Sequence, residues 1–306
     1  MRYLPALARD RVTVAATQTH GHWGGRRNLD EHVAHAFAQL DRAGPELMRY
    51  VGMLDDDGSL VCSAKRYALW ASKPGGAAMR TMGIGAVFTR PDARREGAGT
   101  ALVRAMIDEA RDLGYGAALL YSDIDVAFYE RLGFVTLPAL DRAVAVDALP
   151  TGGAFELRAA EPRDDDRLNA WYEASWEGAA SSWLRSIRCR AAWRYFRWRN
   201  RIAHPWLLAD AGSPVGYLIA AAEQDGAGQE KALWVEEWSA PGQPRERALA
   251  TLRLLAIREG ASSVRGALRS DPLAPAGADG RHIRSGDARR GLEVLVRPEV
   301  RAGWVG

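Results

Sequence analysis

The segment TRPDARREGAGTALVRAM, residues 89–106, constrains the fold of this chain more than any other. The apolar run AMRTMGIGAVF before it predicts a strand, and apolar residues recur at helical spacing in its second half. Arg94, Gly97 and Gly99 stand between the two. Glycines at a helix start let the backbone approach a ligand, and the N–H groups of the first helical turn attract an anion. The segment therefore predicts a strand–loop–helix unit that binds a phosphate.

Two other phosphate-binding loops are also rich in glycine, and each requires particular residues at fixed positions. A dinucleotide-binding fingerprint needs a third glycine where Leu102 stands, and a Walker phosphate loop needs a lysine before Thr100. The residues exclude both. A tight turn before an ordinary surface helix stays open on this stretch alone.

The arrangement Arg-x-x-Gly-x-Gly between a strand and a helix resembles motif A of the GCN5-related N-acetyltransferases, the GNAT superfamily. The resemblance implies that the loop holds the pyrophosphate of acetyl-CoA and that the preceding strand pairs with the pantetheine arm. It also implies that a strand N–H near Val87 holds the oxyanion of the tetrahedral intermediate. The cofactor-binding residues implied in this way are Val87, Phe88, Arg94, Arg95, Glu96, Gly97, Ala98, Gly99 and Thr100.

A second segment, DVAFYERLGF at residues 125–134, follows one predicted strand and one turn later. It resembles motif B of the same superfamily, in which a short aromatic helix ends in Gly-Phe. The matching tyrosine is Tyr129, and the resemblance implies that Tyr129 is the general acid towards the CoA thiolate. Phe128 and Phe134 are expected in the core. The resemblance to this superfamily covers about residues 50–140.

The general base is harder to assign, because residues 79–88 contain no acidic side chain. Two aspartates follow the next predicted strand, and two histidines lie in the first predicted loop. An amine of modest pKa could also lose its proton to water, so the base stays open. Asp123 is taken as a catalytic candidate, and the substrate candidates are His20, His22 and Trp23. The candidate bases are Asp123, Asp125, His20 and His22.

The predicted elements run helix, helix, hairpin, strand, helix, strand, helix, strand, which indicates an α+β fold around one sheet. Asn28 is the expected N-cap of the second helix, with Glu31 completing a capping box. A turn-rich link at residues 147–153 is followed by the same order of elements. We therefore expect a GNAT fold over residues 1–148, with a central mixed sheet flanked by helices. A second, degenerate GNAT-like domain over residues 149–306 is expected to contribute to the substrate site.

The second half carries no phosphate loop, because the matching segment WSAPGQPRERALATL lacks Gly-x-Gly and Pro244 lacks an N–H group. An arginine- and tryptophan-rich helix is predicted over residues 182–201. Alternating arginines and aromatic rings can hold nucleic acid through phosphate contacts and stacking. One apolar stripe on this helix instead favours a core face with a solvated arginine face, or a contact between domains. The stripe consists of Leu184, Ile187, Ala191, Tyr195 and Trp198.

Composition limits the partners that the chain can have. The 41 basic and 38 acidic residues leave a net charge of +3, and this near balance argues against nucleic acid. The two cysteines and six histidines show no metal-ligand spacing, so no metal is expected. Charges interrupt the apolar residues near the N-terminus, and no run is long enough to span a bilayer. We expect a cytoplasmic protein without a membrane partner, either a monomer or a homodimer.

The paired motifs imply an acetyl-CoA-dependent N-acetyltransferase. Its expected acceptor is the primary amine of a small molecule, amino-acid-like or another amine-bearing metabolite, which attacks directly. The segments HWGGRRNLDEH and LLYSDIDVAFYERLGF are similar to fungal lysine N-acetyltransferase-like proteins, and this similarity bears on the substrate class. A protein N-acetyltransferase is the alternative among enzymes. A non-catalytic nucleic-acid- or protein-binding module that uses the helix at 182–201 is the alternative of another class.

Overall fold

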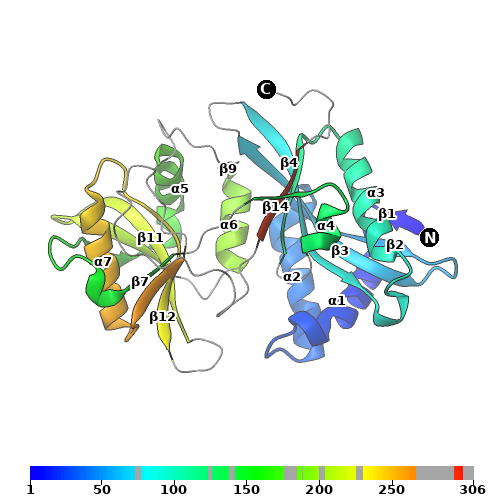
Figure 1. Ribbon diagram of the computed structural model, residues 1–306, viewed down its shortest axis with the longest axis horizontal. Helices are drawn as coiled ribbons and strands as arrows, with labels where there is room; N and C mark the ends of the chain where they lie inside the picture. The colour runs from blue at the N-terminus through cyan, green and yellow to red at the C-terminus, as the bar shows by residue number, and fades with distance from the viewer. Residues whose placement is uncertain are drawn as a thin grey trace. The chain divides into compact units, whose positions relative to one another are not determined.

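The computed structural model describes two units of the chain (Figure 1). Unit 1 takes its residues from 1–138, 181–199 and 292–306, and unit 2 takes its residues from 139–180 and 200–291. The sequence predicts a single boundary after residue 148, so the chain returns to unit 1 where no return was expected. The structure describes residues 1–72, 77–122, 126–137, 142–175, 185–187, 189–199, 204–224, 230–266 and 293–298.

Unit 1 is an α+β fold built on one mixed sheet, as expected. The strand order is β1-β2-β3-β4-β5-β14-β6, with β9 paired to β3. Pairing is antiparallel from β1 to β4 and parallel between β4 and β5. The elements are β1 (Arg2–Leu4), α1 (Arg9–Trp23), α2 (Leu29–Leu47), β2 (Met48–Leu54), β3 (Leu60–Ser72), β4 (Ala78–Thr89), the 3-10 turn η1 (Pro91–Ala93), α3 (Ala98–Asp112), β5 (Ala117–Ser122), α4 (Val126–Glu130), β6 (Val135–Leu137), β9 (Arg185–Ile187), α6 (Arg190–Arg199) and β14 (Glu293–Pro298).

Helices cover both faces of this sheet (Figure 1). Successive residues of a strand point to opposite faces, so β2 buries Val51 and Met53 against α3. Its neighbours Met48 and Tyr50 pack on the other side, against α1, α2 and α6. The unit therefore has two apolar layers, one on each side of the strands that carry the glycine loop.

Several local structures in unit 1 follow from short sequence patterns. The Asn28 side chain accepts the Glu31 N–H at 2.9 Å, and Glu31 Oε2 accepts the Asn28 N–H at 2.9 Å, which completes the capping box. The helix that starts here runs on to Leu47, with a kink where Gly44 has φ +68°. The β2–β3 hairpin turns at Gly58, whose φ of +81° favours glycine.

The helix predicted over 182–201 is wrong in its first part. Residues Arg185–Ile187 form β9, which pairs antiparallel with Trp70–Ser72 of β3. β2 ends its pairing with β3 at Tyr67, so this end of β3 has a free edge that β9 can complete. The helix α6 begins only at Arg190, and Leu184 lies outside the described residues.

The aromatic face of α6 belongs to the core of unit 1. Tyr195 is 1% exposed, and Trp198 packs against the same cluster while its ring stacks on His35 at 5.6 Å. Arg190 and Arg194 lie on the exposed face. These rings are occupied by protein contacts, which agrees with a core face rather than with base stacking. Two members of the predicted stripe do not lie on this face, because Ile187 belongs to β9 and Ala191 is exposed.

The strand β14 also lies in unit 1, although the predicted boundary assigned its residues to the second domain. β14 inserts between β5 and β6 and pairs antiparallel with both. An edge strand needs a partner for its backbone N–H and C=O groups, and sequence distance does not restrict which strand supplies them.

Unit 2 is a second α+β layer with strand order β7-β13-β12-β11-β10-β8. Leu252 and Leu255 of α7 pack on one face of this sheet, and the Trp171 ring of α5 stacks on Tyr217 on the other at 6.5 Å. Its elements are β7 (Arg142–Ala145), η2 (Val146–Ala148), β8 (Glu156–Ala159), η3 (Pro162–Asp164), α5 (Asp165–Ala174), β10 (His204–Asp210), β11 (Ser213–Gln224), β12 (Lys231–Ser239), α7 (Arg245–Arg258) and β13 (Ser263–Gly266).

The strand–helix–strand unit β12–α7–β13 repeats β4–α3–β5. In both cases the two strands are parallel and joined by a helix. In unit 2 the register with the preceding strand shifts around Glu236, and the pairing with β13 reaches Val235. A second GNAT-like domain accounts for this topology, as expected.

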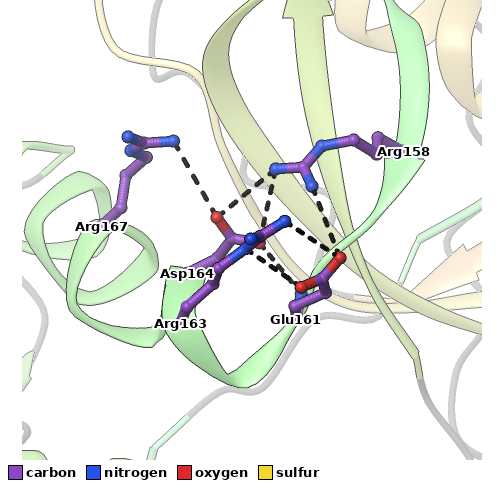
Figure 2. Close-up of polar contacts among 5 residues, drawn as sticks. All are labelled: Arg158, Glu161, Arg163, Asp164 and Arg167. Carbon is purple, nitrogen blue, oxygen red and sulfur yellow. Dashed lines mark hydrogen bonds and ion pairs between the residues drawn. The ribbon is translucent and has the colours of Figure 1, made fainter.

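A charged cluster fixes the start of α5 in unit 2 (Figure 2). The buried Asp164 carboxylate accepts the Glu161 N–H at 2.9 Å and lies 3.4 Å from Arg158 and 3.9 Å from Arg167. Glu161 in turn pairs with Arg163 at 3.0 Å. The bond between Asp164 and Glu161 caps the 3-10 turn η3 that leads into α5, and the contact with Arg158 holds the end of β8 beside this turn, so we assign the cluster to the fold.

Candidate active site

A bulge in β4 marks the place where the sheet opens. Ser63 pairs with Phe88 and Lys65 with Gly85, so three steps along β4 match two steps along β3. Ala86 lies in this bulge with φ +50°, a conformation that non-glycine residues seldom adopt. A bulge bends the strand and leaves backbone groups outside the ladder. Val87, the expected oxyanion-binding position, is therefore part of an irregular segment.

The strands β4 and β5 part at the same level. Their parallel pairing runs from Thr81 with Ala117 to Ile84 with Leu120 and goes no further within the described residues. β4 nevertheless continues to Thr89. The backbone of β4 after Ile84 thus has no β5 partner on that side. Such N–H and C=O groups need another partner, and an extended amide-containing ligand can supply it.

The loop after β4 bends sharply before α3. Arg95 has φ +68° and Gly97 has φ +86°. Gly97 is the N-cap of α3 and makes no side-chain cap bond, because it has no side chain. The first-turn N–H groups of the helix therefore lack a capping side chain, which is the arrangement suited to an anion. Arg94 is held by a bond from its Nε to the Thr89 carbonyl at 3.2 Å.

The second glycine of the loop lies against the end of β4 and against the second motif. A Cβ on Gly99 would stand 3.0 Å from Thr89 Oγ1 and 3.8 Å from Phe128 Cζ. A Cβ on Gly97 would meet nothing within 4 Å. Glycine is therefore favoured at the two positions for different reasons. Gly97 adopts a positive φ, and Gly99 packs closely against its neighbours.

Tyr129 lies on α4, beside these residues in unit 1. Its ring is half-buried and edge-on to Phe128 at 4.9 Å and to Phe134 at 5.8 Å. Phe134 is 3% exposed, as expected of a core residue, whereas Phe128 is only partly buried. The rings fix the plane of Tyr129, and its role as general acid stays a prediction.

The substrate candidates lie in the last turns of α1 rather than in a loop. The rings of His22 and Trp23 lie 5.3 and 6.2 Å from the ring of Phe88, which ends the bulge. Trp23 is 41% exposed. The structure therefore brings two of the three candidates beside Phe88, at the end of the β4 bulge. The helix continues through them because Gly24 still bonds to the His20 carbonyl at 2.7 Å.

His20 differs from its neighbours in what it contacts. Its Nε2 donates to the Arg27 carbonyl at 2.8 Å, and its ring lies 5.6 Å from that of His32. Burial lowers the pKa of His32, and the nearby His20 adds to this effect. These contacts hold the connection between α1 and α2, so they give His20 a structural task. Asp123 and Asp125 lie outside the described residues.

The thiol nearest to the loop is not poised for covalent chemistry. Cys62 is fully buried, and its Sγ lies 3.2 Å from Thr89 Oγ1. Burial raises the pKa of the Cys62 thiol to about 11, so it stays protonated at neutral pH. Since the thiolate is the nucleophilic form, Cys62 is a poor acceptor for an acetyl group.

Lys65 is a residue of this region that the sequence does not single out. It pairs with Gly85 at the edge of the bulge, and its Nζ donates to Gln39 Oε1 at 2.6 Å. Burial lowers the pKa of Lys65 to about 7, and the charge of Arg199 adds to this shift. Its partners come from α2 and α6, so no local sequence pattern could have revealed them.

Within the described ranges, no group of three or more histidine, cysteine, aspartate or glutamate side chains could hold a metal ion. Among the helices that the structure describes, none has the length and apolarity needed to cross a bilayer.

Residues 27–137 match a family model described as an acetyltransferase (GNAT) domain. No curated protein matches the sequence. Among solved structures, the chain resembles a GCN5-related N-acetyltransferase from Anabaena variabilis, with a TM-score of 0.71 and 15% identity over 98% of this chain and 73% of that one. A GCN5-related N-acetyltransferase from Kribbella flavida gives 0.68 and 20% identity over 96% and 70%. Eis1 from Mycobacterium abscessus gives 0.62 and 20% identity over 97% and 74%.

The open strands, the uncapped helix start and the family match together define an acyl-CoA-dependent acyltransferase fold. The chain contains a GNAT acetyltransferase domain at residues 27–137, as the two motifs imply. It is an acetyltransferase whose acyl donor is acetyl-CoA. The loop of unit 1 suits the donor, since Gly97 leaves the helix start open and β4 beyond Ile84 has no β5 partner.

The matching loop of unit 2 is built differently. It has five residues between β12 and α7, whereas eight separate β4 from α3. The N-cap of α7 is Pro244, which has no N–H group, and Gly242 is the one residue of this loop with positive φ. The loop of unit 2 is therefore shorter and lacks the backbone N–H group at its N-cap that could donate to a phosphate. It does not suit a pyrophosphate, in agreement with the absence of Gly-x-Gly from its sequence.

Proposed function

We propose that this protein acetylates the primary amine of a small molecule by direct attack on acetyl-CoA bound in unit 1. The observation that carries the proposal is the opening of β4 from β5 beside the glycine-bounded start of α3. An acetyl thioester that lies along the free edge of β4 would meet the N–H groups of the bulge near Val87. These could hold the oxyanion that forms when the carbonyl carbon is attacked.

The transfer needs one bond to form and one to break. The amine lone pair forms a C–N bond with the carbonyl carbon, and the C–S bond breaks with its electron pair on sulfur. Tyr129 would donate its phenol proton to that sulfur and recover a proton from water. The amine loses one proton to solvent or to a base. The buried, protonated Cys62 supports direct attack over an acetyl-enzyme intermediate.

The acceptor side is proposed from the aromatic residues at the bulge. His22 and Trp23 present exposed rings beside Phe88, and an ammonium group favours the face of an indole ring. A compact amine carries such a group without requiring an extended peptide groove. Unit 2, without a phosphate loop, is proposed to serve acceptor selection rather than acetyl transfer of its own.

A panel assay tests both the donor and the acceptor. The purified full chain is mixed with acetyl-CoA and either small primary amines or peptides, and released thiol is measured. We expect release with small amines. Release only with peptides would favour a protein N-acetyltransferase, and no release with any amine would contradict enzymatic function.

A matched pair of variants tests the cofactor loop. Gly97→Ala places a side chain at φ +86°, and Gly58→Ala does the same at φ +81° in the β2–β3 turn. Neither new Cβ meets an atom within 4 Å, so the local strain is alike. We expect only Gly97→Ala to weaken acetyl-CoA binding, by about tenfold. Equal affinities in the two variants would contradict the assignment of this loop.

A further inference from the structure

A cavity lies beside α3, away from the helix start. It has a volume of about 450 Å³ and lies wholly within unit 1. One wall is formed by α3 and the other by the turn that follows α4. Its lining residues are Arg104, Ile107, Asp108, Arg131, Leu132 and Gly133.

The cavity continues the same face of α3 that begins at the glycine loop. Residues three and four apart lie on one face of a helix, so Gly97, Ala101, Arg104 and Asp108 follow one another along it. A rise of 1.5 Å per residue places Arg104 about 10 Å along the axis from Gly97. Side chains on a helix generally tilt back towards its N-terminus, which is the end of α3 that follows the loop.

The charges at the cavity are predominantly positive. Arg104 and Arg131 are both exposed and both line it. The only carboxylate among the lining residues, Asp108, is paired with Arg111 at 2.6 Å. In the described part of the chain, no carboxylate lies within ion-pair distance of Arg104. Ile107 and Leu132 are buried below these groups and give the cavity an apolar floor.

Two guanidinium groups over an apolar floor suit a phosphomonoester on a nucleoside. The phosphomonoester carries nearly two negative charges at neutral pH, and guanidinium groups bind phosphate oxygens in pairs. CoA carries such a group on its ribose, one sugar away from the pyrophosphate. With the pyrophosphate at the start of α3, this phosphate would lie further along the same helix face.

We propose that Arg104 and Arg131 form a subsite for the 3′-phosphate of CoA, through which the enzyme distinguishes CoA from 3′-dephospho-CoA. This inference rests on the proposed function, because it takes the pyrophosphate to lie at Gly97–Thr100. It adds a specificity determinant that neither glycine motif supplies. Both arginines act on donor binding and not on the transfer of the acetyl group.

Calorimetric titration of the full chain with CoA and with 3′-dephospho-CoA tests the subsite. The proteins are the parent, Arg104→Gln, Arg131→Gln and the double variant. We expect the parent to prefer CoA by at least tenfold, since a charge-assisted hydrogen bond lost at a partly exposed site has about that effect. Each single variant should lose most of this preference and the double variant all of it. Affinity for 3′-dephospho-CoA should stay within about twofold throughout.

Arg80→Gln is the matched control. Arg80 is exposed and donates to the Leu113 carbonyl at 2.8 Å, at the far end of α3. The Arg80→Gln variant loses one positive charge from the same unit, as each single variant does. A general electrostatic effect would therefore lower its preference for CoA by the same amount. An unchanged preference for CoA in the double variant would overturn the subsite. An equal loss of affinity for CoA and for 3′-dephospho-CoA would overturn it as well. A parent that binds neither ligand would overturn the proposed function as well.

Discussion

Phe128 Cζ lies 3.8 Å from the place that a Cβ on Gly99 would occupy. The two residues are 29 positions apart in the chain and belong to different motifs, which this proximity brings together. Phe128 is also edge-on to Tyr129, so the ring that closes over the start of α3 helps to set the plane of the candidate acid. The glycine loop and the tyrosine therefore form one packed group within unit 1.

Gly99→Val should weaken acetyl-CoA binding by at least about tenfold. Its Cβ would stand 3.0 Å from Thr89 Oγ1, and the two extra methyl groups would press on Phe128 or on the ligand. Isothermal titration measures the effect, with thermal unfolding to show that the fold persists. Parent-like affinity in a folded variant would mean that the ligand does not approach this glycine.

Tyr129→Phe should slow the chemical step by roughly 100- to 10,000-fold while leaving acetyl-CoA affinity nearly unchanged, because general acid catalysis contributes that much. The ring keeps its contacts with Phe128 and Phe134, so packing is preserved. Single-turnover rates at saturating acetyl-CoA give the answer. Tyr115→Phe, which removes a hydroxyl from a buried residue outside the motifs, is the control. A rate within about threefold of the parent would mean that another group or water, and not Tyr129, donates the proton.

Lys65→Met should change how stability depends on pH. In the folded chain the pKa of Lys65 is lowered from 10.5 to about 7, so between these values the unfolded chain binds more protons. Stability of the parent therefore gains from Lys65 as pH rises from about 7 towards 10.5. Below pH 7 the ammonium is charged in both states, and its burial opposes folding in full.

Urea unfolding of the parent and Lys65→Met at pH 7 and pH 9 measures this effect. The variant should show its greatest advantage at pH 7 and lose part of it at pH 9. The groups that interact with Lys65 are Gln39, the Tyr50 ring, Arg199 and His32, and the pKa of His32 is itself lowered from 6.5, so His32 is expected to titrate below this range. Parallel pH profiles for the two proteins would show that Lys65 does not titrate in this window.

A fragment that ends at residue 150 should not fold into a stable unit. It would lose Tyr195, which is 1% exposed and bonds to Met48 Sδ at 3.3 Å, and also the β14 partner of β5 and β6. Exposing such a core and two strand edges costs several kcal/mol, of the order of total domain stability. Circular dichroism during thermal unfolding would show a broad transition or none. A cooperative transition close to that of the full chain would contradict the part assigned to α6 and β14.

The sequence by itself determined the features that depend on neighbouring residues. The glycine loop, the helix that follows it, the Asn28 capping box and the Gly58 turn are set by backbone conformations and hydrogen bonds within a few positions. The strand–helix order and the two motifs were also enough to predict the α+β fold and the GNAT superfamily.

Only the tertiary structure decided which distant segments complete unit 1. Residues 185–187 look helical by spacing, yet β3 offers them a free edge and they form β9. β14 joins β5 although more than 170 positions separate them. The desolvation of Lys65 likewise depends on residues from α2 and α6. Edge pairing and burial depend on which surfaces meet in space, and no local pattern in the chain records that.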